Sequence, residues 1–169
     1  AAPVAVAVNT TTNTIYVLGH GELGGNGNPA CPGGAPGTAT LINGATGSST
    51  TVGLGGPGGP YPNTIALDAA TNTAYVLSQG HWVWDGQCAM FINAELITAG
   101  GTPPSTSTVS GGVGSGQAGQ NMALDSTNNK LSVSDFVGNS VIVVDTTTNI
   151  VANTIPLGFS PNNVAVNRA

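Results

Sequence analysis

Short apolar stretches separated by polar turns recur along this chain in one arrangement. In residues 62–77 (PNTIALDAATNTAYVL), an apolar strand leads into a tight polar turn and then into a second strand. The same arrangement occurs at residues 3–18 (PVAVAVNTTTNTIYVL) and 119–134 (GQNMALDSTNNKLSVS), and residues 161–167 (PNNVAVN) begin it again. Val, Ile and Tyr favour strands, whereas Asn, Asp and Gly favour turns. The pattern predicts an all-β chain of repeats.

The third repeat is uninterrupted, so its strands can be placed directly. We expect them at residues 122–124, 130–134, 140–145 and 150–157. The first two repeats follow the same plan, with insertions between their second and third strands at residues 19–37 and 78–87. Their second to fourth strands are expected at residues 14–18, 38–43 and 49–54 in the first repeat, and at 73–77, 88–93 and 106–110 in the second.

Repeated four-stranded units of roughly 40–45 residues are typical of β-propellers. Two further motifs belong to this pattern: NSVIVVDTTTNIVANTIPLG at residues 139–158 and PNNVAVN at residues 161–167. Together with PNTIALDAATNTAYVL, they resemble the YVTN-type β-propeller repeat of microbial surface proteins. The third repeat matches almost throughout, and the first two match in their first three strands. The resemblance implies a propeller fold, while propellers as a class host many unrelated activities.

We therefore predict one domain of β-propeller-type repeats, with three four-stranded blades plus one extra C-terminal strand. The domain spans residues 1–169, with blades at about 3–56, 62–112 and 119–158 and the extra strand at 161–167. Propellers generally close with about 4–8 blades. Three interpretations stay open: a piece of a longer propeller, a ring of several copies, or a head-to-tail filament.

Two apolar stretches near the chain ends are the candidate assembly elements. Residues 4–8 are apolar on both faces of the expected strand, so something must cover them. Residues 163–166 have no expected partner strand, and an unpaired strand is a template for strand addition. Charged residues, which protect strand edges in natural monomers, make up only 5% of the chain. We expect copies of the chain to pair through Val4, Val6, Val8, Asn163, Val164 and Val166.

The charge balance argues against several classes of partner. The chain carries two cations and a net charge of −5, whereas nucleic acids and anionic membranes are bound by clusters of Lys and Arg. No run approaches the roughly 18 apolar residues of a membrane-spanning helix. We expect no nucleic-acid partner and no membrane insertion. Low charge with abundant Thr, Asn and Gly is typical of secreted or cell-surface β proteins, which is the predicted localisation.

Cys31 and Cys88 lie in, or at the end of, equivalent insertions of neighbouring repeats. Neighbouring blades would bring these insertions together, so we predict a disulfide, which requires an oxidising compartment. Closing so long a loop would stabilise the fold by roughly 2–4 kcal/mol. The alternative is two free buried thiols.

The insertions also contain the candidate binding residues. His20 and His81 begin them, and Trp82 and Trp84 would lie on one face of an extended segment. These residues form a candidate surface for a glycan or a protein partner. Packing against the first insertion is the alternative for the tryptophans. Zinc binding by the histidines and cysteines is a further alternative, but no typical ligand spacing is present, so no metal or other cofactor is predicted.

Repeated acidic residues precede the turns rather than mark a catalytic site. Asp68, Asp125 and Asp145 each stand before a Thr/Asn-rich turn, where we expect them to cap the backbone. No nucleophile-elbow, metalloprotease, phosphate-loop or haem-attachment motif occurs, so we do not expect an enzyme. Asn9 begins the only N-x-[ST] sequon and is a candidate glycosylation site, although it lies in a tight turn.

These observations favour an extracellular or cell-surface structural protein that self-assembles through its blade edges into a filament or ring. The alternative is a ligand- or partner-binding module that forms part of a larger β-propeller.

Overall fold

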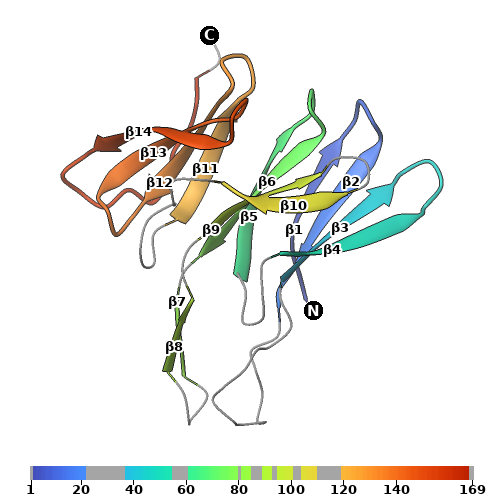
Figure 1. The fold of residues 1–169 in the computed structure, drawn as a ribbon, viewed down its shortest axis with the longest axis horizontal. Coiled ribbons are helices and arrows are strands. Elements are labelled where there is room, and N and C mark those ends of the chain that lie inside the picture. The colour runs from blue at the N-terminus through green and yellow to red at the C-terminus, as the bar shows by residue number, and fades with distance from the viewer. Residues whose placement is uncertain are drawn as a thin grey trace.

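In a computed structural model of the chain, the described residues are 2–21, 37–54, 61–79, 81–84, 89–92, 95–100, 104–109 and 119–167. All regular structure in these ranges is β-strand, which confirms the predicted all-β class. The strands form three four-stranded antiparallel sheets and one two-stranded hairpin. The described sheets fan out from one another and do not close into a barrel or ring (Figure 1).

Each predicted repeat contains one of the four-stranded sheets. The first sheet consists of β1 (Pro3–Asn9), β2 (Thr14–Gly19), β3 (Gly37–Asn43) and β4 (Ser49–Leu54). The second consists of β5 (Tyr61–Asp68), β6 (Thr73–Gln79), β9 (Glu95–Gly100) and β10 (Ser105–Thr108). The third consists of β11 (Gly119–Asp125), β12 (Lys130–Asp135), β13 (Ser140–Asp145) and β14 (Ile150–Pro156).

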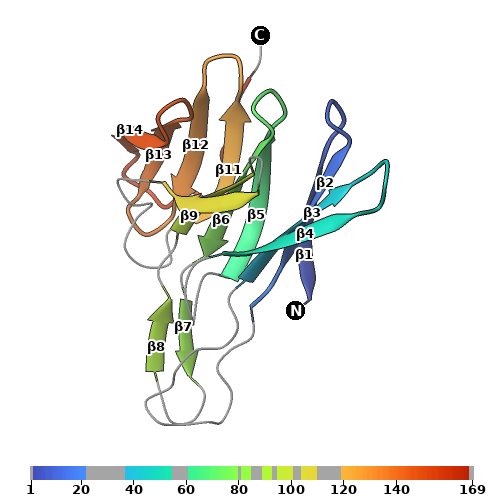
Figure 2. The same cartoon turned by 45° about the vertical axis from the view of Figure 1, so that its right-hand side comes forward.

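The second repeat differs from the prediction in its third strand. Residues 88–93 were expected beside β6, but β9 occupies that position, with Val76 opposite Ile97. Residues 89–92 instead form β8 (Ala89–Ile92), which pairs with β7 (His81–Trp84) in the hairpin. Residues 88–93 and 95–100 both have a composition that suits a strand. Residues 95–100 are the ones that pair with β6. The hairpin extends away from the three sheets (Figure 2).

The predicted extra C-terminal strand is also absent from the described structure. Residues 161–167, named the C-terminal segment below, have no strand assignment. A β-strand requires a hydrogen-bonded neighbour, and no described strand pairs with this segment. The segment therefore has the composition of a strand, as the apolar pattern predicted. The described part of the chain does not provide a neighbouring strand to pair with it.

Five-residue turns close most of the hairpins, and they follow one rule. An Asn or Asp side chain at the first position accepts hydrogen bonds from backbone amides two or three residues later, as Asp125 does from Thr127 and Asn128. The fifth position adopts a left-handed backbone, with φ between 51° and 55° wherever it is Asn. Asn tolerates this conformation better than most residues. The fifth-position asparagines are Asn13, Asn72, Asn129, Asn139 and Asn149.

Two hydrophobic clusters join the three sheets. The cluster between the first and second sheets contains Tyr16, Leu18, Ala39, Leu41, Leu54, Ala74 and Val76. The cluster between the second and third contains Tyr75, Leu77, Val109, Met122, Leu124, Leu131, Val133, Ile142 and Val144. Burying each large apolar side chain contributes roughly 1.5–3 kcal/mol. The second sheet is thus covered on both faces, whereas the described chain covers only one face of the first and third sheets.

The first strands of the three sheets lie side by side. β1 contacts β5, and β5 contacts β11. Farther out, the Thr106 hydroxyl of β10 donates to the Gly53 carbonyl of β4 at 3.2 Å. The N-terminus lies at the first sheet and the C-terminus near the third (Figure 1). The two stretches predicted to mediate assembly are therefore at opposite ends of the row of sheets.

Candidate assembly surface

Side chains along the strands of the second sheet alternate between the two neighbouring sheets. In β6, Ala74 and Val76 pack toward the first sheet, while Tyr75 and Leu77 pack toward the third. This is the two-residue period of a strand that is covered on both faces. The second sheet therefore presents one face to the first sheet and the opposite face to the third.

On the face of the first sheet that points away from the second, the side chains of β1 and β2 are apolar, and those of β1 are exposed. Val4, Val6 and Val8 of β1 are 36%, 62% and 51% exposed. Val6 pairs with Val17 of β2, and Val8 pairs with Ile15, so these two β2 residues continue the surface. We name these five residues the β1 face.

Repeat positions explain why the β1 face is apolar. Val6 and Val8 correspond to Ile65 and Leu67 of β5, which pack in the cluster between the first and second sheets. They also correspond to Met122 and Leu124 of β11, which are buried between the second and third sheets. In the second and third repeats these positions are covered by the preceding sheet. The β1 face has the composition of an inter-sheet contact without the described sheet that would cover it.

The C-terminal segment lies against the third sheet. Pro161 is buried, and Val164 and Val166 are half-buried while Asn163 is exposed. The hydroxyl of Ser134 in β12 donates to the Asn162 carbonyl at 3.3 Å. Just before the segment, the Ser160 hydroxyl donates to the Asn139 side chain at 2.8 Å. The structure therefore holds Val164 and Val166 in contact with the chain, but without a strand ladder.

A buried polar network fixes the junction between the first two sheets. Asn9 is fully buried, and its side-chain amide donates to the Ala69 carbonyl (3.1 Å) and to Asn72 Oδ1 (2.7 Å). The Tyr16 hydroxyl donates to the Asn72 carbonyl at 2.7 Å. Burial raises the pKa of the Tyr16 hydroxyl above its ordinary value. Because both amide hydrogens of Asn9 are used inside the fold, this geometry favours a structural role over glycosylation.

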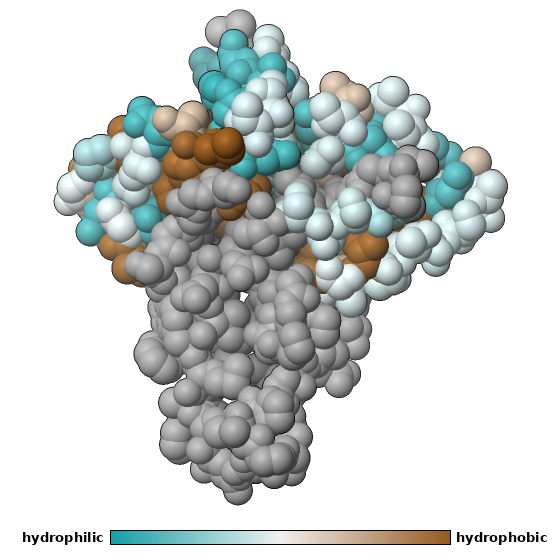
Figure 3. Space-filling model, in the orientation of Figure 1, coloured by the Kyte–Doolittle hydropathy of each residue, from teal (hydrophilic) through white to brown (hydrophobic). Residues whose placement is uncertain are grey.

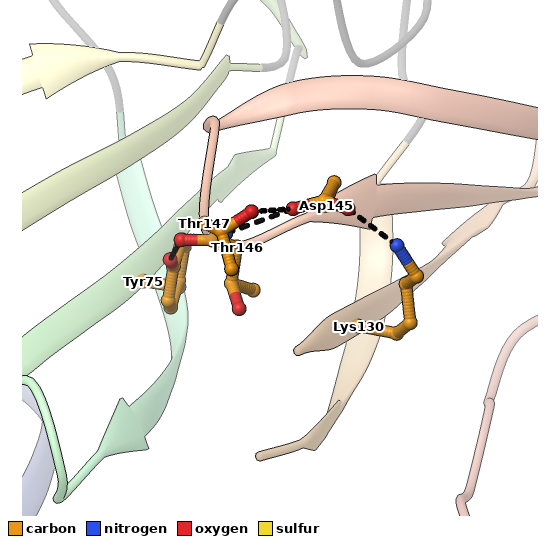
Figure 4. A network of polar contacts seen from close by, with 5 residues as sticks. All are labelled: Tyr75, Lys130, Asp145, Thr146 and Thr147. Atoms are coloured by element: carbon orange, nitrogen blue, oxygen red, sulfur yellow. Dashed lines mark hydrogen bonds and ion pairs between the residues drawn. The ribbon is translucent and has the colours of Figure 1, made fainter. Parts of the chain in front are cut away.

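The junction between the second and third sheets uses different partners (Figure 4). The Tyr75 hydroxyl donates to the Thr146 carbonyl (3.3 Å), the bond drawn in Figure 4. It shares its hydrogen with a second acceptor, Asn149 Oδ1, at 3.0 Å. Both acceptors belong to the β13–β14 turn, whereas Tyr16, at the same repeat position, reaches the β5–β6 turn. Burial raises the pKa of the Tyr75 hydroxyl. The repeats are thus alike in sequence but join their neighbours differently.

Asp145 holds the same β13–β14 turn in place (Figure 4). Its carboxylate accepts hydrogen bonds from Lys130 and from the hydroxyl and backbone amide of Thr147. The Lys130 bond, followed by the two Thr147 bonds, holds the pKa of the Asp145 carboxyl well below its usual range. Asp68 and Asp125 also accept backbone amides of their turns, so the predicted capping role is confirmed for all three aspartates.

Of the other predicted site residues, the two cysteines lie outside the described structure, whereas the histidines and tryptophans lie within it. Cys31 and Cys88 fall in undescribed ranges, so their disulfide stays a prediction. His20 follows β2, and its backbone amide donates to the Ala2 carbonyl. His81, Trp82 and Trp84 lie on β7, which confirms the extended backbone expected there. Among the described residues, no group of three or more His, Cys, Asp or Glu side chains could hold a metal ion.

Exposed apolar residues of the third repeat were missed by the sequence analysis. Apolar side chains gather over the third sheet at the left of Figure 3. The most exposed of the third repeat's large apolar residues are Phe136, Val137, Ile150, Ile155 and Phe159. Phe159 is the most exposed of these residues, at 63%. Phe136 and Val137 lie in a turn where the repeat pattern otherwise has polar residues. This departure from the pattern could have identified them from the sequence.

Comparisons with known proteins return no relative that would assign a function. No protein-family model matches the chain, and no curated protein sequence matches it. The described part of the chain contains no helix long and apolar enough to cross a membrane. Function must therefore be argued from the surface of the molecule itself.

Replacing Tyr16 by Phe should destabilise the fold by about 1 kcal/mol, because the ring still packs but the Asn72 carbonyl loses its donor. Tyr16→Leu should cost more, since it also removes ring packing. Equilibrium denaturation of the three proteins measures both differences. An unchanged free energy of unfolding in Tyr16→Phe would show that the hydroxyl does not stabilise the junction.

The lowered pKa of Asp145 predicts acid sensitivity. A carboxyl whose pKa is lower in the folded chain stabilises it above the ordinary value of about 4, and this stabilisation is lost as the pH falls below that value. Asp145→Asn should therefore have a lower free energy of unfolding than the native chain at pH 6, and the difference between the two should become smaller by pH 2–3. Denaturant titrations at several pH values test this. A difference in unfolding free energy that does not change with pH would exclude the ion pair as the cause of that difference.

Proposed function

We propose that this chain is an extracellular or cell-surface structural protein whose copies assemble through the β1 face and the C-terminal segment. Its three sheets act as β-propeller-type blades, and the assembly is a filament or a ring. The observation that supports this most strongly is the β1 face, whose repeat equivalents Ile65, Leu67, Met122 and Leu124 all pack against a preceding sheet. A preceding sheet from another copy would bury the same kind of surface.

The charge distribution supports association between copies. The described residues of the β1 face are uncharged, and the chain as a whole has only two cations. Natural edge strands are commonly protected by Lys or other charges that oppose pairing. Neither β1 nor the C-terminal segment through Asn167 contains a charged residue. Association along these elements therefore meets little electrostatic resistance.

A second candidate function is favoured by the hairpin. β7 and β8 extend from the three sheets (Figure 2), and β7 contains His81, Trp82 and Trp84. Aromatic residues on an extended element are suited to recognising a glycan or protein surface. In this alternative the chain is a binding module within a larger propeller, and the 169-residue chain stays monomeric at every concentration.

A charge placed on the β1 face should separate the two functions. Val6→Asp introduces a carboxylate at a 62% exposed position, so the monomer should fold normally while assembly weakens by at least tenfold in concentration. Thr10→Asp, in the exposed β1–β2 turn, is the charge-matched control and should assemble like the native chain.

Sedimentation velocity over a concentration series, with electron microscopy of the largest species, measures the effect. Assembly of the native chain that Val6→Asp leaves unaltered would exclude direct packing on the β1 residues Val4, Val6 and Val8 as the contact. A native chain that remains monomeric throughout would overturn the structural proposal and favour the binding module.

A further inference from the structure

The C-terminal segment resembles β1 more closely than it resembles the other first strands. Residues 164–167 read VAVN, identical to residues 6–9, and Pro161 corresponds to Pro3. The equivalent residues are IALD in β5 and MALD in β11. The segment thus repeats β1 at Pro161 and at residues 164–167, including the final asparagine, while Asn162 and Asn163 replace Val4 and Ala5.

The asparagine at the end of β1, Asn9, donates hydrogen bonds that an aspartate could not donate. Asn9 both caps its own turn through Oδ1 and donates through Nδ2 to Ala69 and Asn72 of the second sheet. Asp68 and Asp125, at the same position in the next repeats, act as acceptors toward their turns, and a carboxylate has no hydrogen to donate. Asn167 retains the donor that the junction between the first two sheets requires.

We propose that the C-terminal segment of one copy replaces β1 in the first sheet of a second copy. This inference rests on the proposed self-assembly and revises its contact: β1 leaves the sheet, and Val164 and Val166 take the places of Val6 and Val8 beside Ile15 and Val17. Direct packing on an intact β1 is weakened by Val6→Asp, whereas strand replacement is not. The segment would pair with β2 in the register that β1 has now, with Val164 opposite Val17, Val166 opposite Ile15 and Asn167 opposite Thr14. Asn167 would then donate to Ala69 and Asn72 of the second copy.

The topology of the first sheet allows this replacement. β1 is an edge strand and pairs only with β2, so one ladder is broken and an equivalent one forms. The segment gives up no ladder of its own, because it has none in the described structure. Within one copy the second sheet lies between the first and the third (Figure 1), so the acceptor is a second copy.

The replacement also explains how the uncovered faces of the first and third sheets come to cover each other. Because the segment lies against the third sheet through Ser134, pairing it with β2 brings the first sheet of the second copy onto the third sheet of the first. Ile15 and Val17 would then face β12 and β13, where Ser132, Val141 and Val143 are half-buried in the isolated chain. This continues the two inter-sheet contacts that each copy already contains, and apolar burial drives it.

Locking β1 in place tests the proposal. Val6 and Val17 are directly opposite in the β1–β2 ladder, so Val6→Cys with Val17→Cys should form an intrachain disulfide on oxidation. The oxidised variant should lose assembly and regain it on reduction. The native chain, treated with the same oxidant and reductant, controls for Cys31 and Cys88, and peptide mass spectrometry assigns the new link.

Asn167→Asp gives an independent readout. The side chain of Asn167 is exposed in the isolated chain, so its folding should be unchanged, while assembly should require at least tenfold more protein. Asn63→Asp, at an exposed position of β5 outside the segment, is the matched control and should assemble like the native chain. Assembly that persists in the oxidised lock, or is unaltered by Asn167→Asp, would overturn strand replacement and leave the proposed function standing. A native chain that never assembles would refute both.

Discussion

Face-to-face burial between consecutive sheets is the constraint on which this structure depends. No sheet of four short strands is stable with both of its apolar faces in water, and here the middle sheet uses both faces while the outer two each use one. The inter-sheet tyrosines and the buried Asn9 set how each sheet sits on the next. In the described chain, the β1 face at the beginning of this row has no sheet that covers it.

This constraint links the fold to the proposed assembly. The β1 face is not an isolated apolar patch, because the same repeat positions are buried wherever a preceding sheet exists. The C-terminal segment supplies the matching element, a strand sequence without a strand partner in the described chain. In the proposed assembly they would relate one copy to the next head to tail, and such a contact gives a ring if it closes and a filament if it does not.

Local sequence chemistry predicted the strands well, because the turns are local. The Asx cap and the left-handed Asn of each turn lie within five residues, and β13 matches its predicted range, Ser140–Asp145. The third strand of the second sheet could not be chosen this way, since residues 88–93 and 95–100 both suit a strand. Val4, Val6 and Val8, the β1 residues predicted for assembly, do lie on the exposed side of the strand, although both its faces are apolar in sequence. The Tyr75 contact with the β13–β14 turn depends on sheet placement, which no local pattern encodes.

The most direct test is the concentration dependence of amide hydrogen exchange in the C-terminal segment, measured by peptide mass spectrometry. In dilute protein, residues 163–167 lack a ladder and should exchange rapidly, as solvent-accessible backbone does. In the assembled state they should become as protected as β12, whose ladder is internal to one copy. Exchange that stays fast in assembled protein, or the absence of any concentration effect, would contradict the central claim that copies join through this segment.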